Sequence, residues 1–434
     1  MERNLELKQF SKYVSLNILG MLGVSCYILA DTFFIAKGMG TLGLAALNIA
    51  IPAFNLVGSF GLMLGIGGAT RFTIAKSRGD AEEAEAVFNN TFAAVIVVAI
   101  LFELAGFFLC SEIVGLLGAD ESTFDMTYTY LRMLFLFSPF FLMNNIFMAF
   151  VRNDGDPNLS MTAQLVGSFA NIILDYVFIF PLQMGIFGAV LATCLSPIIS
   201  LTILLLHKLK GNNNFHLKKI KVQSKRLAAI ASLGTPSFVT EISGGLVIMI
   251  FNIIILGIEG NTGVAAYGVV ANVSIVVTAI FNGIAQGSQP LISHAYGSSN
   301  SKAIKKYMKY AIVAVALISA AIYAVVIVFA QPITSVFNSE NNYLLQEIAE
   351  TGLKIYFAAS FFVGFNIFVA IYFSSSERAL PAQIISLARG IVLIVPMAFL
   401  LSNILGMTGV WLSYPATEAV VSIIAIIFLK YRRV

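Results

Sequence analysis

Apolar segments of about 20 residues or more recur along the whole chain, and they constrain its fold more than any other feature. The hydrocarbon core of a bilayer is about 30 Å thick, and a helix of about 20 residues crosses it. Of the 434 residues, 58% are hydrophobic and only 11% are charged, whereas a soluble domain carries roughly 25% charged residues. The apolar runs are continuous rather than alternating, which favours helices over a barrel. The sequence therefore predicts an all-α polytopic membrane protein.

We predict twelve transmembrane helices. The predicted spans are residues 12–36, 43–70, 88–113, 128–151, 159–181, 185–207, 228–257, 263–292, 308–331, 346–374, 380–402 and 406–430. The first span is too long for the apolar region of a cleavable signal peptide, so we expect it to remain as an uncleaved anchor.

Lys and Arg residues are distributed unequally between the two sets of loops. One set holds little beyond Lys37. The other set holds Arg71, Lys76, Arg78, Arg152, the basic cluster in residues 208–226, Lys302 to Lys309, Arg378, and the tail residues Lys430, Arg432 and Arg433. Because basic loops stay in the cytoplasm, we expect a multi-pass protein of the cell (inner) membrane with both termini cytoplasmic. These basic residues should be solvated, so the net charge of +4 reflects topology and not nucleic-acid binding.

Cysteine and histidine usage argues against a metal or redox site. Cys26, Cys110 and Cys194 all fall in apolar segments, and no C-x-x-C pair is present. The three histidines lack the spacing of a zinc site. With no visible nucleophile or metal set, we expect a protein that is not an enzyme and has no cofactor.

The two halves of the sequence resemble each other at a shift of about 220 residues. Matching positions include Gly40 with Gly260, Gly65 with Gly283, Asn145 with Asn366, and Gly185 with Gly406. Each half holds six spans, an even number, so the halves should be parallel repeats related by an axis along the membrane normal. We predict two pseudo-symmetric six-helix lobes, residues 1–210 and 227–434, joined by a cytoplasmic linker, residues 211–226. Such lobes suit alternating access, and a channel is the rival interpretation although no ring of filter residues repeats.

Asp31 and Asp175 lie inside apolar spans, where a carboxylate is costly and marks a functional site by default. Asp31 is six residues from Lys37 and Asp175 is six residues from Pro181, so each lies roughly 9 Å below the surface at about 1.5 Å per residue. Asn171 lies one turn from Asp175 on the same helical face, as Tyr27 does from Asp31. Thr193 falls at a similar depth. These side chains from three helices should form one polar layer.

Two carboxylates in such a pocket should not both ionise without a proton or a cation. No Lys or Arg lies at this depth on these spans. We therefore expect the pocket to take up H⁺ or Na⁺, with Asp31 and Asp175 as the metal ligands if the ion is Na⁺. Asn145 lies deeper and fits the layer less well. A buried, hydrogen-bonded structural pair is the alternative.

The second half lacks this acid pair. It places Glu241, Arg389 and Glu418 inside spans seven, eleven and twelve. Arg389 could neutralise one glutamate in a structural ion pair, or the three residues could form a substrate site or second coupling site. The Gly-rich stretch from Gly58 to Gly68 is more typical of close helix packing than of a ligand loop.

Several motifs together resemble the MATE (multidrug and toxic compound extrusion) family over nearly the whole chain. They are LADTFFI at residues 29–35, GTLGLAAL at 40–47, GDP at 155–157, NIILD at 171–175, GIFGAVLAT at 185–193 and QGSQP at 286–290. The resemblance implies twelve helices in two lobes, export of amphipathic and often cationic compounds, and drive by H⁺ or Na⁺.

When the family's motif positions are matched residue by residue to this sequence, the resemblance implies a cation-coupling site at Asp31, Asn171, Asp175 and Thr193. Neighbouring polar positions fall on Tyr27, Tyr130 and Asn145, and the acid that some members carry in span seven falls on Glu241. The chain departs from some members in having no proline in span one and no acid in span ten. The first departure argues against a mechanism in which a proline bends that helix.

Together these observations predict a secondary active antiporter in the lipid bilayer that exports small amphipathic, cationic organic compounds in exchange for H⁺ or Na⁺ by alternating access. We expect the protein to be a monomer and to bind no nucleic acid. A lipid-linked saccharide flippase of the same superfamily is the alternative, and an ion channel is less favoured.

Overall fold

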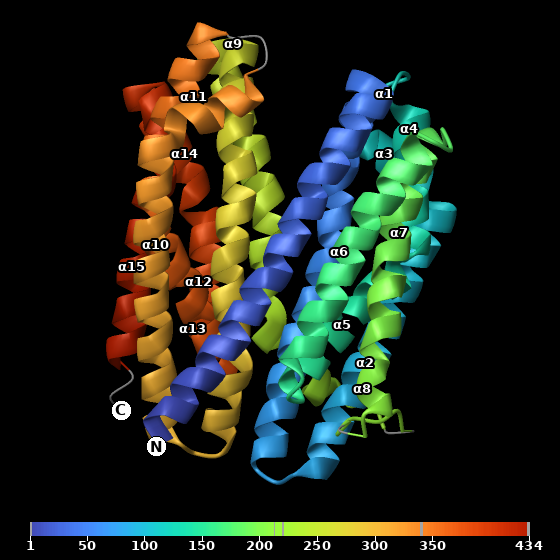
Figure 1. Ribbon diagram of the computed structural model, residues 1–434, viewed down its shortest axis with the longest axis vertical. Coiled ribbons are helices and arrows are strands. Elements are labelled where there is room, and N and C mark those ends of the chain that lie inside the picture. The colour runs from blue at the N-terminus through green and yellow to red at the C-terminus, as the bar shows by residue number, and fades with distance from the viewer. Residues whose placement is uncertain (1, 212, 219–220, 339–341, 432–434) are drawn as a thin grey trace.

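In the computed structural model the chain is built from helices, and residues 2–211, 213–218, 221–338 and 342–431, which the structure describes, contain no strand. This confirms the predicted all-α fold (Figure 1). Asn212 of the predicted linker, Lys219 of the basic cluster and the tail residues Arg432 and Arg433 lie outside the described residues. The first half comprises α1 Glu2–Ser77, α2 Ala81–Phe108, α3 Cys110–Leu116, α4 Phe124–Leu136, α5 Ser138–Asn153, α6 Pro157–Ile179, α7 Gly185–Leu204 and α8 Leu206–Leu209. The second comprises α9 Ser224–Gly297, α10 Ser301–Phe337, α11 Tyr343–Tyr356, α12 Ser360–Ser375, α13 Ala379–Leu387, α14 Ile394–Leu405 and α15 Met407–Lys430.

Two long helices, α1 and α9, each contain two spans separated by a glycine. Gly40 has φ 66° and ψ −154°, and Gly260 has φ 61° and ψ −154°, a conformation that side chains with a Cβ rarely adopt. Gly185 and Gly406 also share a positive φ, 57° and 59°. The glycines matched in sequence thus break the backbone alike in both halves, as expected for a duplicated fold.

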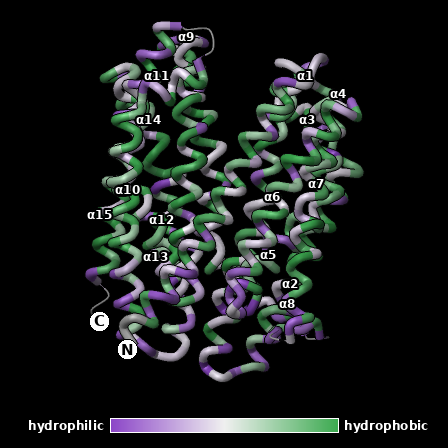
Figure 2. The backbone as a smooth tube through the Cα atoms, viewed as in Figure 1, coloured by the Kyte–Doolittle hydropathy of each residue, from purple (hydrophilic) through white to green (hydrophobic). Residues whose placement is uncertain are grey.

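The number of spans agrees with the prediction once these breaks are considered. Nine helices in the described part of the chain are long and apolar enough to cross a membrane, and the pair α4 and α5, bent by 50°, makes ten. Dividing α1 and α9 at their glycines gives twelve. Hydrophobic residues cover the middle of the bundle and hydrophilic ones gather in the connections at its ends (Figure 2).

The helices form two lobes, each with its own buried hydrophobic core. Phe88 and Phe150 belong to one core, and Phe368 and Trp411 to the other. The lobes approach each other at the end where both termini of the chain lie, here called the base, and separate toward the opposite, open end (Figure 1). Helix α1 starts beside α10 of the second lobe, where Phe10 and Tyr310 have ring centroids 5.7 Å apart, and then crosses to the first lobe.

Glycines allow the lobes to touch backbone to backbone. A Cβ atom at Gly67 would lie 2.0 Å from the carbonyl oxygen of Ile230, and one at Gly234 would lie 1.8 Å from that of Met63. Close helix packing, predicted for the stretch that includes Gly67, is therefore confirmed at this position. These contacts join the second span of α1 to the first span of α9 and hold the lobes together toward the base.

Polar contacts reinforce the closed base. Glu377, in the turn between α12 and α13, accepts hydrogen bonds from Arg71 on α1 at 2.8 Å and from Arg78, just after α1, at 3.0 Å. Deeper between the lobes, Asn153 donates to the side chain of Gln289 at 2.8 Å. Because these partners come from opposite lobes, opening the base would break all of these contacts.

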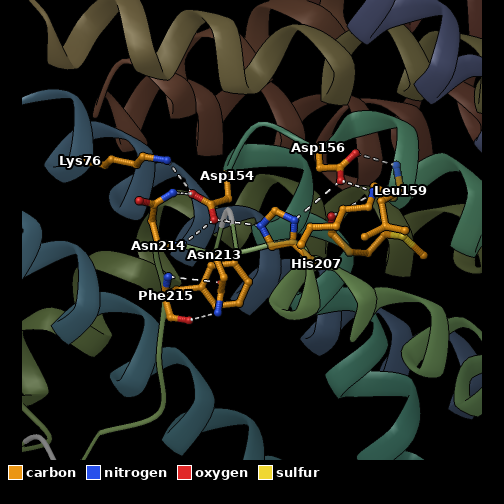
Figure 3. Close-up of polar contacts among 11 residues, drawn as sticks. Lys76, Asp154, Asp156, Leu159, His207, Asn213, Asn214 and Phe215 are labelled. Carbon is orange, nitrogen blue, oxygen red and sulfur yellow. Dashed lines mark hydrogen bonds and ion pairs between the residues drawn. The ribbon is translucent and has the colours of Figure 1, made fainter.

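The linker is attached to the first lobe rather than running free. Buried Asp154, after α5, accepts hydrogen bonds from Lys76 Nζ at 2.6 Å and from the backbone N–H of Asn214 at 2.8 Å, and it lies 2.9 Å from His207 Nε2 (Figure 3). The next linker residue, Phe215, is buried against Phe88, with ring centroids 4.7 Å apart. The hydrogen-bonded carboxylate and the buried ring thus fix the start of the linker.

We expect Asp154→Ala to release the linker. Burial acts to raise the pKa of the Asp154 carboxyl, but the His207 and Lys76 contacts and the Asn214 N–H outweigh it and hold this pKa below its ordinary value. The stabilisation is therefore present above the ordinary value of about 3.9 and lost as the pH falls through the lower folded value. Removing the carboxylate at neutral pH should cost about 3 kcal/mol. Trypsin should then cleave the linker faster than in the exposed-site control Asp125→Ala, and equal cleavage rates would show that Asp154 does not anchor it.

Candidate ion-coupling site and central cavity

Helices α1 and α6 bring Asp31 and Asp175 together within the first lobe. Asp175 is fully buried and Asp31 is 8% exposed, and their carboxyl groups lie within hydrogen-bonding reach of each other. Glycines on α1 fix this pairing, since a Cβ at Gly23 would lie 2.7 Å from Leu165 and one at Gly38 would lie 2.4 Å from Ile179. Both contacted residues are on α6, so the two helices pack closely on either side of the acid pair.

Several buried oxygen atoms in this pocket have no hydrogen-bond donor among the described residues. They are Asp31 Oδ1, Asn171 Oδ1 and both carboxylate oxygens of Asp175. A buried acceptor without a partner costs about 1–3 kcal/mol, and more when it is charged. A proton between the two carboxyl groups would satisfy both of them, and oxygen atoms are also the ligands that hard cations prefer. The pocket therefore has the chemistry of a cation or proton site.

Thr193 and Tyr130 complete the wall of the pocket. Asn171 Nδ2 donates to Thr193 Oγ1 at 3.4 Å, and the Thr193 hydroxyl donates to the carbonyl of Ala189 at 3.2 Å. Buried Tyr130 lies beside Thr193. The structure thus brings together Asp31, Asn171, Asp175 and Thr193 of the predicted layer, and Tyr130 of α4, which the family resemblance placed nearby, lies beside them.

Tyr27 and Asn145 lie on the central cavity rather than between the two acids. Asn145 donates to the carbonyl of Phe141 at 3.0 Å, and it packs against Gly61, where a Cβ would be 2.8 Å from its amide nitrogen. Tyr27 is close enough to both Asp31 and Glu241 to interact electrostatically with each, so it lies between the acid pair and the second lobe.

The central cavity lies between the lobes and has a volume of about 220 Å³. Its walls combine apolar side chains such as Met21, Phe54 and Phe141 with a similar number of polar and charged ones. Thr193 and Tyr27 belong both to this lining and to the surroundings of the acid pair. A compound in the cavity would thus be separated from Asp31 and Asp175 by single side chains.

In the second lobe, Arg389 and Glu418 form a buried ion pair. Arg389 donates to Glu418 Oε1 through Nη2 at 2.7 Å and through Nε at 3.1 Å, and Asn366 donates to Glu418 Oε2 at 2.7 Å. The turn Ala388–Val392 is π-helical, and such turns often occur at functional sites. The ion-pair alternative is therefore confirmed for Arg389 and Glu418, while Asn366, matched in sequence to Asn145, is a partner that sequence reasoning missed.

Glu241 differs from Glu418 in its surroundings. It lines the cavity, whereas Glu418 does not, and it takes part in no ion pair within the described part of the chain. Of the three charged residues expected in the second lobe, the structure thus pairs two and leaves Glu241 facing the cavity.

The expectation for Arg152 was wrong. Its position near the end of a span predicted a solvated loop residue, but it is only 4% exposed and lines the cavity. Helix α5 continues to Asn153, and this carries Arg152 between the lobes.

Comparison with known proteins relates both the sequence and the fold to one family. The family model described as MatE matches residues 17–177 and 236–400. "Multidrug export protein MepA" of Staphylococcus saprophyticus is 24% identical over 96% of this chain and 92% of its own length, and the protein of that name from Staphylococcus haemolyticus is 26% identical over 95% and 91%. Among solved structures, "Crystal structure of MATE in complex with MaL6" has a TM-score of 0.93 at 22% identity, covering 98% of this chain and 96% of that one. "Outward-facing conformation of a multidrug resistance MATE family transporter of the MOP superfamily" has a TM-score of 0.90 at 23% identity, covering 98% and 96%.

Proposed function

The chain belongs to the MATE family of multidrug efflux transporters, and on this premise we propose that it exports amphipathic organic cations in exchange for protons. The observation that carries the proposal is the pair Asp31 and Asp175, whose buried oxygens lack donors among the described residues. The pair lies beside a cavity between two lobes, and that cavity has a lining of mixed apolar and polar side chains that includes the acid Glu241. A cavity that combines apolar side chains with an acid suits a compound that is both hydrophobic and positively charged.

Exchange requires that the proton and the organic cation favour different states of the protein. In the proposed cycle, one proton shared by Asp31 and Asp175 leaves the pair with a single negative charge and removes their mutual repulsion, which allows the surrounding helices to pack more closely. Thr193 and Tyr27, which link the pair to the cavity, then shift and weaken the site for the organic cation. Release of the proton on the cytoplasmic side restores that site. Na⁺ is the alternative coupling ion, because the same oxygens could bind it.

We place the base on the cytoplasmic side of the cell membrane, with both termini inside. The support is the concentration of Lys and Arg at the base, including Arg71, Arg78 and Lys306, since basic loops remain in the cytoplasm. In this orientation the lobes are closed toward the cytoplasm and separate toward the outside (Figure 1). A similar solved structure is described as an outward-facing conformation, which agrees with this assignment.

We expect Glu241→Gln to weaken export of cationic dyes. Glutamine keeps the size of the side chain but removes the charge, and an interaction with a charged group is worth about 1.5–3 kcal/mol, or roughly tenfold to a hundredfold in affinity. Concentration-dependent efflux from cells would measure the loss. The matched control is Glu259→Gln, on the same helix near Gly260 and outside the cavity lining. Equal efflux in Glu241→Gln and the control would remove Glu241 from the substrate site.

The saccharide flippase is less favoured, because a diphosphate carries several negative charges and would need a strongly cationic wall, whereas Arg389 is neutralised by Glu418 and the lining also carries the acid Glu241. We also propose that the protein functions as a monomer in the lipid bilayer and transports small organic compounds.

The proposed function is tested by measuring dye accumulation in cells with and without the protein, over a panel of cationic, neutral and anionic dyes. Lower accumulation of cationic dyes in expressing cells is expected. Unchanged accumulation of every dye would contradict multidrug export by this chain.

A further inference from the structure

Arg152 is a buried cation whose hydrogen-bond acceptors in the described part of the chain are neutral. It lies in the last turn of α5, at the base side of the central cavity, and is 4% exposed. Its Nη1 atom donates to Asn17 Oδ1 at 3.1 Å and to Gln286 Oε1 at 3.4 Å, while its Nε atom has no acceptor among the described residues. Asn17 is on α1 and Gln286 is on α9, so the guanidinium bridges the lobes where they close.

No carboxylate in the described part of the chain lies within ion-pairing distance of Arg152. The nearest acid in sequence, Asp154, is engaged by Lys76 and His207. Arg389, the other arginine on the cavity, has Glu418 as a counter-ion. Arg152 therefore contributes a net positive charge to the base side of the cavity, because a guanidinium does not lose its proton in proteins.

An unpaired buried charge is costly, and packing does not account for it, since a neutral amide could make the same contacts with Asn17 and Gln286. What the charge does is repel other cations. At a separation of about 8 Å and an effective dielectric constant of about 20, repulsion between unit charges lowers the occupancy of a second cation roughly thirtyfold. Single arginines exclude protons and cations from other membrane pores in this way.

We propose that Arg152 is an electrostatic barrier that prevents cations from leaking through the closed base of the cavity. The proposal rests on the proposed function only in that the cavity is taken to hold cations. The charge repels both a proton and an organic cation on the path from the cavity to the cytoplasm while the lobes are closed there. When the base opens, Arg152 separates from Gln286 on the opposite lobe and no longer spans the path.

The test is passive proton flux into proteoliposomes without any organic substrate, driven by a potassium diffusion potential and followed with an internal pH dye. Asn17→Asp keeps Arg152 and its acceptor but adds a counter-charge, and Arg152→Gln removes the charge. We expect each to raise proton flux about tenfold, while Arg152→Lys keeps it near the wild-type rate. Asn300→Asp adds the same charge on the exposed cap of α10 and should leave the flux unchanged.

A purely structural role makes the opposite prediction for Asn17→Asp. The new ion pair would then tighten the base and leave proton flux unchanged or lower, and this result would overturn the proposal. It would also be overturned if Asn17→Asp left proton flux unchanged and instead abolished export of anionic dyes, which would make Arg152 a binding group for anions. Because the flux is measured without substrate, failure of cation export in the wild type would contradict the proposed function without deciding the role of Arg152.

Discussion

Asp175→Asn should abolish coupled export while the protein remains folded in the membrane, and Asp31→Asn should do the same. Asparagine has nearly the same shape as aspartate but cannot carry the exchanged proton, so the site keeps its packing and loses its chemistry. We expect the efflux rate of a cationic dye to fall at least about tenfold, the effect of losing one charge-assisted interaction of about 1.5–3 kcal/mol. Dye efflux from energised cells, normalised to the amount of protein in the membrane, measures this loss.

Asp125→Asn is the matched control, because Asp125 is exposed in the first turn of α4. It should export like the wild type. Dye binding to purified Asp175→Asn separates loss of coupling from loss of the fold, since a folded variant should still bind dye in the cavity. If both buried-site variants exported at the wild-type rate, the acid pair would be a structural feature without a role in coupling.

Gly234→Leu should prevent the lobes from closing at the base. Even a Cβ atom at Gly234 would lie 1.8 Å from the backbone carbonyl oxygen of Met63, and a backbone atom cannot turn aside as a flexible side chain can. Overpacking costs about 1–3 kcal/mol or more, enough to reduce the population of the base-closed state roughly tenfold. Spin labels at the open ends of the two lobes should therefore report shorter distances, and dye efflux should stop.

Gly244→Leu provides the control on the same helix. A Cβ at Gly244 meets nothing within 4 Å, so this variant should keep both the distance distribution and the efflux of the wild type. If Gly234→Leu also kept the wild-type distances, the glycine contact would not decide which end of the protein is closed.

The arrangement in two lobes and the grouping of the first-lobe residues could be inferred from local patterns, whereas the role of that site stays a prediction. Helical spacing alone places Asn171 one turn from Asp175, and the apolar spans give the depth at which Asp31 should meet them. The structure brings these residues together as expected. Matched glycines such as Gly40 and Gly260 likewise predicted the repeat, since their need for a positive φ is a property of the residue itself.

Other features depend on how separate helices are aligned, which spacing does not determine. Whether Arg389 meets Glu418 depends on the relative positions of α15 and the turn after α13 across the membrane. The sequence alone therefore leaves both an ion pair and a substrate site open. The burial of Arg152 was missed because basic residues near the ends of spans are usually solvated. The sequence places Phe215 in a polar linker. Its burial in the core of the first lobe depends on the hydrogen bond that fixes the preceding residue, Asn214, to Asp154.

The most direct measurement of the central claim, cation-coupled export through the acid pair, uses proteoliposomes containing the purified protein and a fluorescent organic cation. A pH gradient and a Na⁺ gradient are imposed one at a time, with the wild type and Asp175→Asn compared in each. We predict that the pH gradient alone drives dye movement in the wild type and that Asp175→Asn abolishes it. Movement driven only by the Na⁺ gradient at equal pH would replace the proton by Na⁺ at the same site. Dye movement that neither gradient drives, or that Asp175→Asn performs as fast as the wild type, would contradict coupling through Asp31 and Asp175.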